Sequence, residues 1–167
     1  MSLLRALWTG EPITVDGAEF ATREARIDPP AEHPIPIWLG SYGPRALALT
    51  GRRADGWLPS LGRLTLAEAS ARREVVRAAA AEAGRDPDDV TCACNIAIRV
   101  RPGAEPSPGV LTGTVDEVVA QTLEVVAAGF TVLLVHSLTE ADQELLAAEV
   151  LPAVRAAAVE RGFARLP

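Results

Sequence analysis

A short loop with two glycines, Gly40-Ser41-Tyr42-Gly43-Pro44, is the part of this sequence best suited to bind a small anion. The apolar run before it predicts a strand, and residues 45–52 after it predict a helix. Pro44 suits the first helical position, where an N–H group has no partner to lose. Backbone N–H groups at a helix N-terminus that follows a parallel strand commonly bind phosphate. The competing interpretation is an ordinary strand-to-helix turn in which glycine only relieves strain.

Other side chains with possible chemistry lie near the ends of predicted strands. His136 ends the last predicted strand, so it is the best candidate for proton transfer or a substrate contact. A capping or surface histidine is the alternative. Asn95 and Arg99 share one face of a strand, and Arg99 fits either a phosphate contact or a surface ion pair. Trp57 fits a pocket wall or the core equally well.

Three further polar residues have weaker functional interpretations. Arg45 follows the loop, where it either adds positive charge to the anion site or only solvates the helix. Asp55 precedes a predicted strand, where a solvated carboxylate is favoured over a bond to loop amides. His33 lies in a proline-rich connector, which indicates a structural or solvent-facing role.

Composition excludes several classes of function. The chain has 167 residues and a net charge of −6, without a basic cluster, so we exclude nucleic acid as a partner. All sixteen basic residues are arginine, which excludes lysine nucleophiles and Schiff bases within this chain. Cys92 and Cys94 are two residues apart, which fits neither a disulfide nor a metal site and indicates packing in a reduced, cytoplasmic protein. No run is apolar enough to span a membrane, and residues 1–10 lack the core of a signal peptide.

Periodicity and capping residues predict the elements that position these side chains. After a helix end at 2–9, Asp16-Gly17 predicts a hairpin turn within residues 11–23. The remaining strands are predicted at 37–40, 56–59, 90–100 and 130–136, and the last of them is expected to be buried. The remaining helices are predicted at 44–53, 65–84, 114–128 and 139–161. Residues 101–113 are predicted to form a loop. Pro152 predicts a kink in the last helix.

Alternating strands and helices predict an α/β fold with a parallel sheet and ligands at the C-terminal strand ends. We expect a single domain over residues 1–167, with β/α units from about 36 to 163. Four units are half of an eight-unit barrel, so the pattern fits an open sheet or half of a TIM-barrel-like fold.

Four stretches together resemble the bacterial luciferase-like family of flavin- or deazaflavin-dependent oxidoreductases. PIPIWLGSYGPRALALTGRRADGWLP, from Pro34, is similar to the family's segment around the fifth and sixth barrel strands. GEPITVDGAEF resembles its hairpin insertion, LTGTVDEV its helix start before the last strand, and AAEVLPAVR its closing helix. The resemblance covers essentially the whole chain but only the C-terminal half of the family's barrel.

The resemblance implies hydride transfer or oxygen-dependent monooxygenation with FMN or the deazaflavin coenzyme F420. It places the cofactor's phosphate end at Gly40, Ser41, Tyr42, Gly43 and Pro44, through backbone N–H groups and the Ser41 hydroxyl. The loop sequence favours the deazaflavin branch. Nothing in the chain corresponds to the first four barrel strands, which implies an N-terminal half-barrel partner. The alternatives are a truncated or split half-barrel without activity of its own and a homodimer of two half-barrels that binds phosphate.

Overall fold

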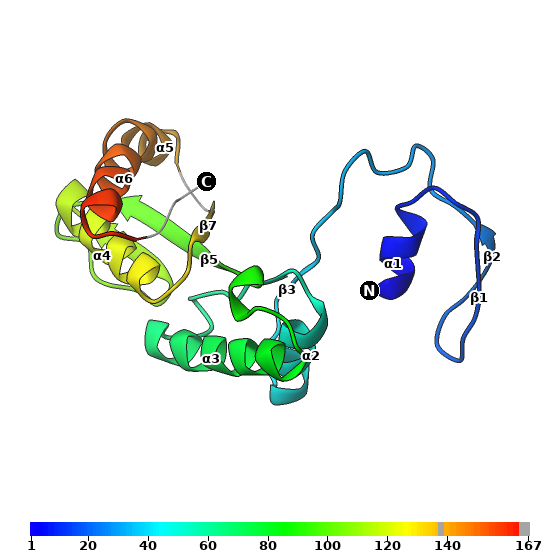
Figure 1. The fold of residues 1–167 in the computed structure, drawn as a ribbon. Helices are drawn as coiled ribbons and strands as arrows, with labels where there is room; N and C mark the ends of the chain where they lie inside the picture. Colours follow the sequence, from blue (N-terminus) through cyan, green and yellow to red (C-terminus); the bar gives the residue numbers. More distant parts are fainter. Residues whose placement is uncertain (137–138, 164–167) are drawn as a thin grey trace. The chain divides into compact units, whose positions relative to one another are not determined.

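The computed structural model describes residues 1–136 and 139–163, which divide into two compact units. The first unit is Met1–Ile37, and the second begins at Trp38. In the first unit, helix α1 (Ser2–Leu7) precedes an antiparallel hairpin of β1 (Ile13–Asp16) and β2 (Ala21–Ala25), as Figure 1 shows.

The hairpin differs from the sequence prediction in its turn. Asp16 pairs with Ala21, so residues 17–20 form a four-residue connection in place of a two-residue Asp-Gly turn. The second strand therefore starts later than predicted, and the hairpin reaches Ala25 instead of residue 23. A register shift between Ile13 and Val15 lies beside Glu24, whose φ is 50°.

The second unit alternates strands with helices. Its elements are β3 (Trp38–Leu39), α2 (Pro44–Arg53), β4 (Gly56–Trp57), α3 (Leu66–Glu82), a 3₁₀ turn (Pro87–Asp89), β5 (Thr91–Val100), β6 (Val110–Gly113), α4 (Val115–Ala127), β7 (Val132–His136), α5 (Glu140–Leu145), a π-helical turn (Leu146–Val150) and α6 (Leu151–Glu160). The strands pair in parallel throughout, so the predicted parallel α/β fold class is confirmed.

Strand β5 is the centre of this sheet, with β3 and β4 on one side and β7 on the other. The backbone N–H groups of Thr91 and Asn95 donate to the carbonyls of Asp55 and Pro59, around β4. The N–H of Ala97 donates to the carbonyl of Gly109, just before β6. Strands β4 and β6 therefore occupy the same edge of β5 in succession, and the order β3-β4-β5-β7 follows the chain.

Two strand predictions need correction. The predicted loop 101–113 contains β6, whose four residues pair with residues 97–100 of β5. A strand this short between two glycines has no alternation by which to recognise it. The predicted buried strand 130–136 is observed as β7, but Leu134 is 38% exposed. No described strand pairs with the outer edge of β7, which leaves an apolar strand partly uncovered.

The helices begin and end where their caps predict. Thr65, Thr114 and Thr139 each form a capping box with the acidic residue three positions later. Gly129 has φ 90° just after α4, a conformation that favours glycine. The expected kink at Pro152 takes the form of a π-helical turn just before α6. Pro152 itself lies in the first turn of α6.

The core lies between the sheet and its helices. Cys92, Cys94, Ile96 and Ile98 alternate along β5 and are all buried on the helix side. Both cysteines are free thiols, so their predicted role in packing is confirmed. Helices α2 and α3 approach closely at Gly51, where a Cβ would lie only 2.9 Å from the Ala79 Cβ. Among the described helices, none has the length and apolarity needed to cross a membrane.

Candidate functional site

The loop Gly40–Pro44 connects the C-terminal end of β3 to the N-terminus of α2. Gly40, Gly43 and Pro44 are exposed, Tyr42 is half-buried, and Ser41 is buried. Because all strands of this sheet are parallel, the loop lies at the edge where ligands bind in such folds. The sequence prediction therefore placed this segment at the correct end of the sheet.

Helix α2 begins without a side-chain cap. Its N-cap, Gly43, has extended backbone angles (φ −79°, ψ 153°), and Pro44 takes the first helical position. The first amide to bond within the helix is that of Leu47, which donates to the Gly43 carbonyl at 2.9 Å. The N–H groups of Arg45 and Ala46 thus have no acceptor within the helix. No acidic residue occupies this first turn. The N-terminus of α2 therefore combines available N–H donors with the partial positive charge of the helix dipole.

The Ser41 side chain points away from such a ligand site, toward α2. Its Oγ lies 2.8 Å from Oγ1 of Thr50, which itself donates to the Ala46 carbonyl at 2.8 Å. A threonine hydroxyl has one proton, so Ser41 must be the donor to Thr50. The Ser41 proton is thereby used inside the protein. Consequently this hydroxyl positions the loop, and donation to an anion falls to the backbone.

Two further contacts hold the loop against the neighbouring strand. Trp57 is fully buried, and its Nε1 donates to the Ser41 carbonyl at 2.9 Å. Its ring packs on Phe130 with centroids 5.9 Å apart, which places Trp57 in the core and not on a pocket wall. The Tyr42 hydroxyl accepts from the Ser60 N–H at 3.0 Å, and the Arg63 guanidinium lies 4.6 Å from the Tyr42 ring centroid. The loop is consequently fixed from both ends.

The two glycines of the loop differ in what surrounds them. A Cβ at Gly40 would lie 3.2 Å from the Leu58 carbonyl oxygen, so this position packs closely against the chain after β4. A Cβ at Gly43 would meet nothing within 4 Å. The Cβ position of Gly43, the N-cap of α2, is therefore open.

The other predicted site residues do not gather around this loop. His136 ends β7 and pairs in register with Ala97 of β5, so three interstrand spacings of about 4.8 Å each separate β7 from β3. Asn95 donates from Nδ2 to the Ser60 Oγ at 3.3 Å, a structural contact. Arg99 is exposed near the end of β5. His136 and Arg99 thus share the loop's end of the sheet without adjoining it.

The remaining charged candidates lie on the periphery. Arg45 is exposed in the first turn of α2, and Asp55 is half-buried at the start of β4. His33 is exposed in the first unit. Within the described residues, no group of three or more His, Cys, Asp or Glu side chains could hold a metal ion.

Sequence reasoning missed the residues that hold the loop. Thr50 lies nine positions beyond Ser41 and Ser60 eighteen beyond Tyr42, so neither contact has a local signature. A threonine among the apolar positions of α2 was the one available signal.

A cavity of about 500 Å³ between the start of α3, β6 and α4 was also not predicted from the sequence. It is lined on the helix side of the sheet, by residues such as Ile96 and Val125, and does not include the loop.

Known proteins match both the sequence and the fold. The family model described as luciferase-like monooxygenase matches residues 1–107. The phthiodiolone/phenolphthiodiolone dimycocerosates ketoreductase of Mycobacterium bovis (strain BCG / Pasteur 1173P2) is 36% identical over 137 residues, which are 80% of this chain and 32% of that protein. The F420-dependent glucose-6-phosphate dehydrogenase of Nakamurella multipartita is 36% identical over 91 residues, 54% of this chain and 26% of that protein.

A solved structure gives the corresponding result for the fold. An F420-dependent secondary alcohol dehydrogenase in complex with an F420-acetone adduct superposes with a TM-score of 0.79 at 17% identity. The match covers 92% of this chain and 59% of that one. This chain spans about a third of the length of the curated relatives it matches. The parallel β/α units are therefore similar to part of a larger luciferase-like fold. With its family model matched over residues 1–107, this chain belongs to the luciferase-like monooxygenase family.

Proposed function

We propose that this chain provides the phosphate-binding part of an oxidoreductase that uses a deazaflavin of the F420 type, with FMN as the second candidate. The observation that carries the proposal is the uncapped N-terminus of α2, open at Gly43 and held in place by Ser41 and Tyr42. The F420-dependent relative from Nakamurella supports the choice of a deazaflavin. The intact enzyme would catalyse hydride transfer or, as the family description suggests, monooxygenation.

The donor set fits a phosphate group. The Arg45 and Ala46 N–H groups lie in the first turn of α2, with the open side of Gly43 before them. The positive end of the helix dipole favours an anion there, and Arg45 adds a formal positive charge. Gly40 and Pro44 shape the loop, and Tyr42 anchors it to Ser60. When bound, such a cofactor supplies the hydride chemistry, while these residues orient it.

We assign His136 to proton transfer or substrate contact in the completed enzyme. It lies at the C-terminal end of β7, in register with Ala97 of β5. Replacement His136→Asn should therefore lower turnover of the completed enzyme while leaving cofactor affinity unchanged. Equal activity of the variant would remove His136 from the mechanism.

We also propose that a separate N-terminal half-barrel completes the fold. No described strand covers the outer edge of β3 or of β7. Leu134 on β7, in register with Asn95 of β5, is 38% exposed, and the first four strands of a barrel would cover this apolar side chain. The part of the alcohol dehydrogenase that has no counterpart here is consistent with such a partner. A homodimer of half-barrels is the alternative, and sizing chromatography of the isolated chain distinguishes it from a monomer.

The test uses the open space at Gly43. Gly43→Asp should cap α2 and place a carboxylate where the phosphate would bind, while Gly43→Asn caps the helix without the charge. We expect Gly43→Asp to raise the unfolding free energy by about 0.5–1 kcal/mol and to abolish F420 and FMN binding in a fluorescence titration. Gly43→Asn should weaken binding less, because it competes for the N–H groups without repelling the phosphate. Unchanged cofactor affinity in Gly43→Asp would contradict the proposed site.

A further inference from the structure

The cavity of about 500 Å³ beside α3 and α4 is complete within this chain. Its walls come from the segment after β4, the start of α3, β6 and the middle of α4, and Ile96 of β5 also lines it. All of these belong to the second unit of the fold. None of the lining residues belongs to the loop Gly40–Pro44, to β3 or to β7. A ligand of this cavity would therefore need neither the cofactor site nor a partner half-barrel.

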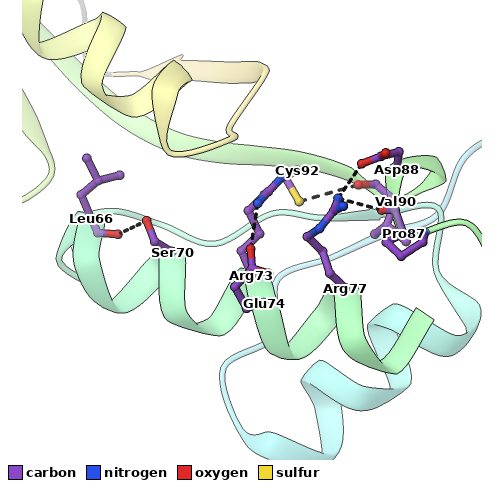
Figure 2. Close-up of polar contacts among 9 residues, drawn as sticks. All are labelled: Leu66, Ser70, Arg73, Glu74, Arg77, Pro87, Asp88, Val90 and Cys92. Atoms are coloured by element: carbon purple, nitrogen blue, oxygen red, sulfur yellow. Dashed lines mark hydrogen bonds and ion pairs between the residues drawn. The ribbon is translucent and has the colours of Figure 1, made fainter. Parts of the chain in front are cut away.

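The walls of this cavity are mainly aliphatic. Figure 2 shows Leu66 in the first turn of α3, where its carbonyl accepts a hydrogen bond from the Ser70 Oγ at 2.8 Å. Ligand pockets for small molecules measure roughly 300–1,000 Å³, and the volume here lies within that range. The size and lining suit the apolar body of a small molecule. The aliphatic side chains that line the cavity are Leu61, Leu64, Leu66, Ile96, Leu111 and Val125.

Two glycines hold two of these walls together. Gly109, just before β6, has a φ of 71°, and a Cβ there would collide with the backbone of Gly62. The Val110 N–H donates to the Ser107 carbonyl at 3.0 Å, which closes the turn that contains Gly109. The segment after β4 and the start of β6 are therefore fixed against each other. The cavity between them is preformed, so a ligand would not have to open it.

Two polar side chains of the lining already have partners. Gln121 accepts from the Thr112 N–H at 3.2 Å and donates to the Thr112 carbonyl at 2.8 Å. Glu68 accepts from the Thr65 N–H at 2.8 Å in the capping box of α3. Both side chains are used in holding β6 and α3, so neither requires a polar group from a ligand.

Glu124 is the charged lining residue that has no such partner. It is exposed on α4, and its carboxylate forms no hydrogen bond or ion pair with the rest of the described chain. The Arg63 guanidinium, in contrast, lies 4.6 Å from the centroid of the Tyr42 ring. Arg63 against Glu68 and Glu124 leaves the lining with a formal charge of −1, in a chain whose net charge is −6. The cavity therefore favours a cation over an anion.

We propose that this cavity binds a small apolar molecule that carries an ammonium group. The aliphatic walls contact its apolar body, and the Glu124 carboxylate pairs with its ammonium group at the rim. This ligand is additional to the proposed cofactor, and its binding does not depend on that cofactor.

The direct test is NMR of the wild-type full chain with ¹³C-labelled methyl groups, titrated with 1-naphthylmethylamine, which is protonated at neutral pH. We expect saturable shifts at the methyl groups of Ile96, Leu111 and Val125. The neutral analogue 1-naphthalenemethanol should bind about two- to fivefold more weakly, as expected for the loss of one exposed ion pair, and 1-naphthoate more weakly still. Absence of saturable shifts at these three residues would overturn the proposal. Equal or tighter binding of the alcohol or of the naphthoate would overturn its ammonium part.

A pair of variants tests the role of Glu124 in the same titration. Glu124→Gln should lower the affinity for the amine to that for the alcohol and leave the affinity for the alcohol unchanged. Glu82→Gln is the control, because it removes the same charge from an exposed position of α3 outside the lining. It should retain the wild-type preference for the amine. A Glu124→Gln variant that keeps this preference would refute the assigned ion pair.

Discussion

Replacement Thr50→Val tests the hydrogen bond between Ser41 and Thr50 that holds the candidate site. Thr50 is fully buried, and its Oγ1 donates to the Ala46 carbonyl while accepting from Ser41. Valine has nearly the same shape, so the cavity term is small. The change leaves the Ser41 hydroxyl, which is only 8% exposed, without its acceptor. A buried polar group left unsatisfied costs about 1–3 kcal/mol, so we expect a loss of about 2 kcal/mol.

The fold provides a matched control for this substitution. Thr122 in α4 is 2% exposed and also donates to the carbonyl four residues earlier, that of Val118, at 2.7 Å. No second hydroxyl donates to it in the described structure. Thr122→Val should therefore change the unfolding free energy by about 0.5 kcal/mol or less. The comparison isolates the bond from Ser41.

The assay is urea denaturation followed by far-ultraviolet circular dichroism. If the chain is unfolded by heat instead of urea, the same loss of 2 kcal/mol corresponds, for a chain of this size, to a decrease in melting temperature of about 4–8 °C. Ser41→Ala alone should cost about 1 kcal/mol, and the double variant should be less destabilised than the sum of the two changes. If Thr50→Val is no worse than Thr122→Val, the bond between Ser41 and Thr50 does not stabilise the loop as inferred.

Three further predictions concern stability. Asp142 accepts from the Val100 N–H at 3.1 Å and from Thr139, so Asp142→Ala should lower the unfolding free energy by about 2–3 kcal/mol in urea denaturation. Hydrogen bonding by Thr139 lowers the pKa of the Asp142 carboxyl, so this stabilisation should be lost as pH falls below about 4. Burial raises the pKa of Cys94 to about 12, so the unfolding free energy should fall above about pH 8.5 and up to about 12, by as much as about 1.4 kcal/mol per pH unit. Cys94→Ala should flatten this slope, and an unchanged slope would contradict the assignment. Gly51→Ala should destabilise by about 1–3 kcal/mol through overpacking of α2 on α3, and a stabilised variant would argue against that contact.

The helices were predictable because their signals are local. Pro44 fixed the start of α2, and the threonines at 65, 114 and 139 cap the later helices as their positions indicated. Each cap acts within about four residues, so the sequence contains it in full. The same holds for the parallel fold class, which follows from the alternation of elements along the chain.

The strand errors arise from information outside the local sequence. Strand β6 exists because residues 97–100 of β5 offer a free edge beyond β4, which no local pattern reveals. The exposure of Leu134 depends on what covers β7, since its apolar sequence is typical of an interior strand. The hairpin register depends on a bulge near Ile13, and bulges have weak sequence signals.

The candidate site was predictable in position but not in detail. The loop at Gly40–Pro44 followed from glycines, proline and the strand before them. The sequence prediction assigned the Ser41 hydroxyl to the phosphate, whereas the structure directs its proton to Thr50. That distinction depends on a contact between residues nine positions apart and on the proton count of Thr50. We therefore propose phosphate binding through backbone N–H groups, with Ser41 as a positioning residue.

The central claim is tested most directly by following the backbone amides of the ¹⁵N-labelled chain during titration with FMN and, separately, with riboflavin, which lacks the phosphate. We predict saturable shifts at Gly43, Arg45 and Ala46 with FMN, and shifts at least about tenfold weaker in apparent affinity with riboflavin, because the phosphate makes the contact. The same response to both ligands, or shifts confined to residues outside the loop and the first turn of α2, would contradict the account.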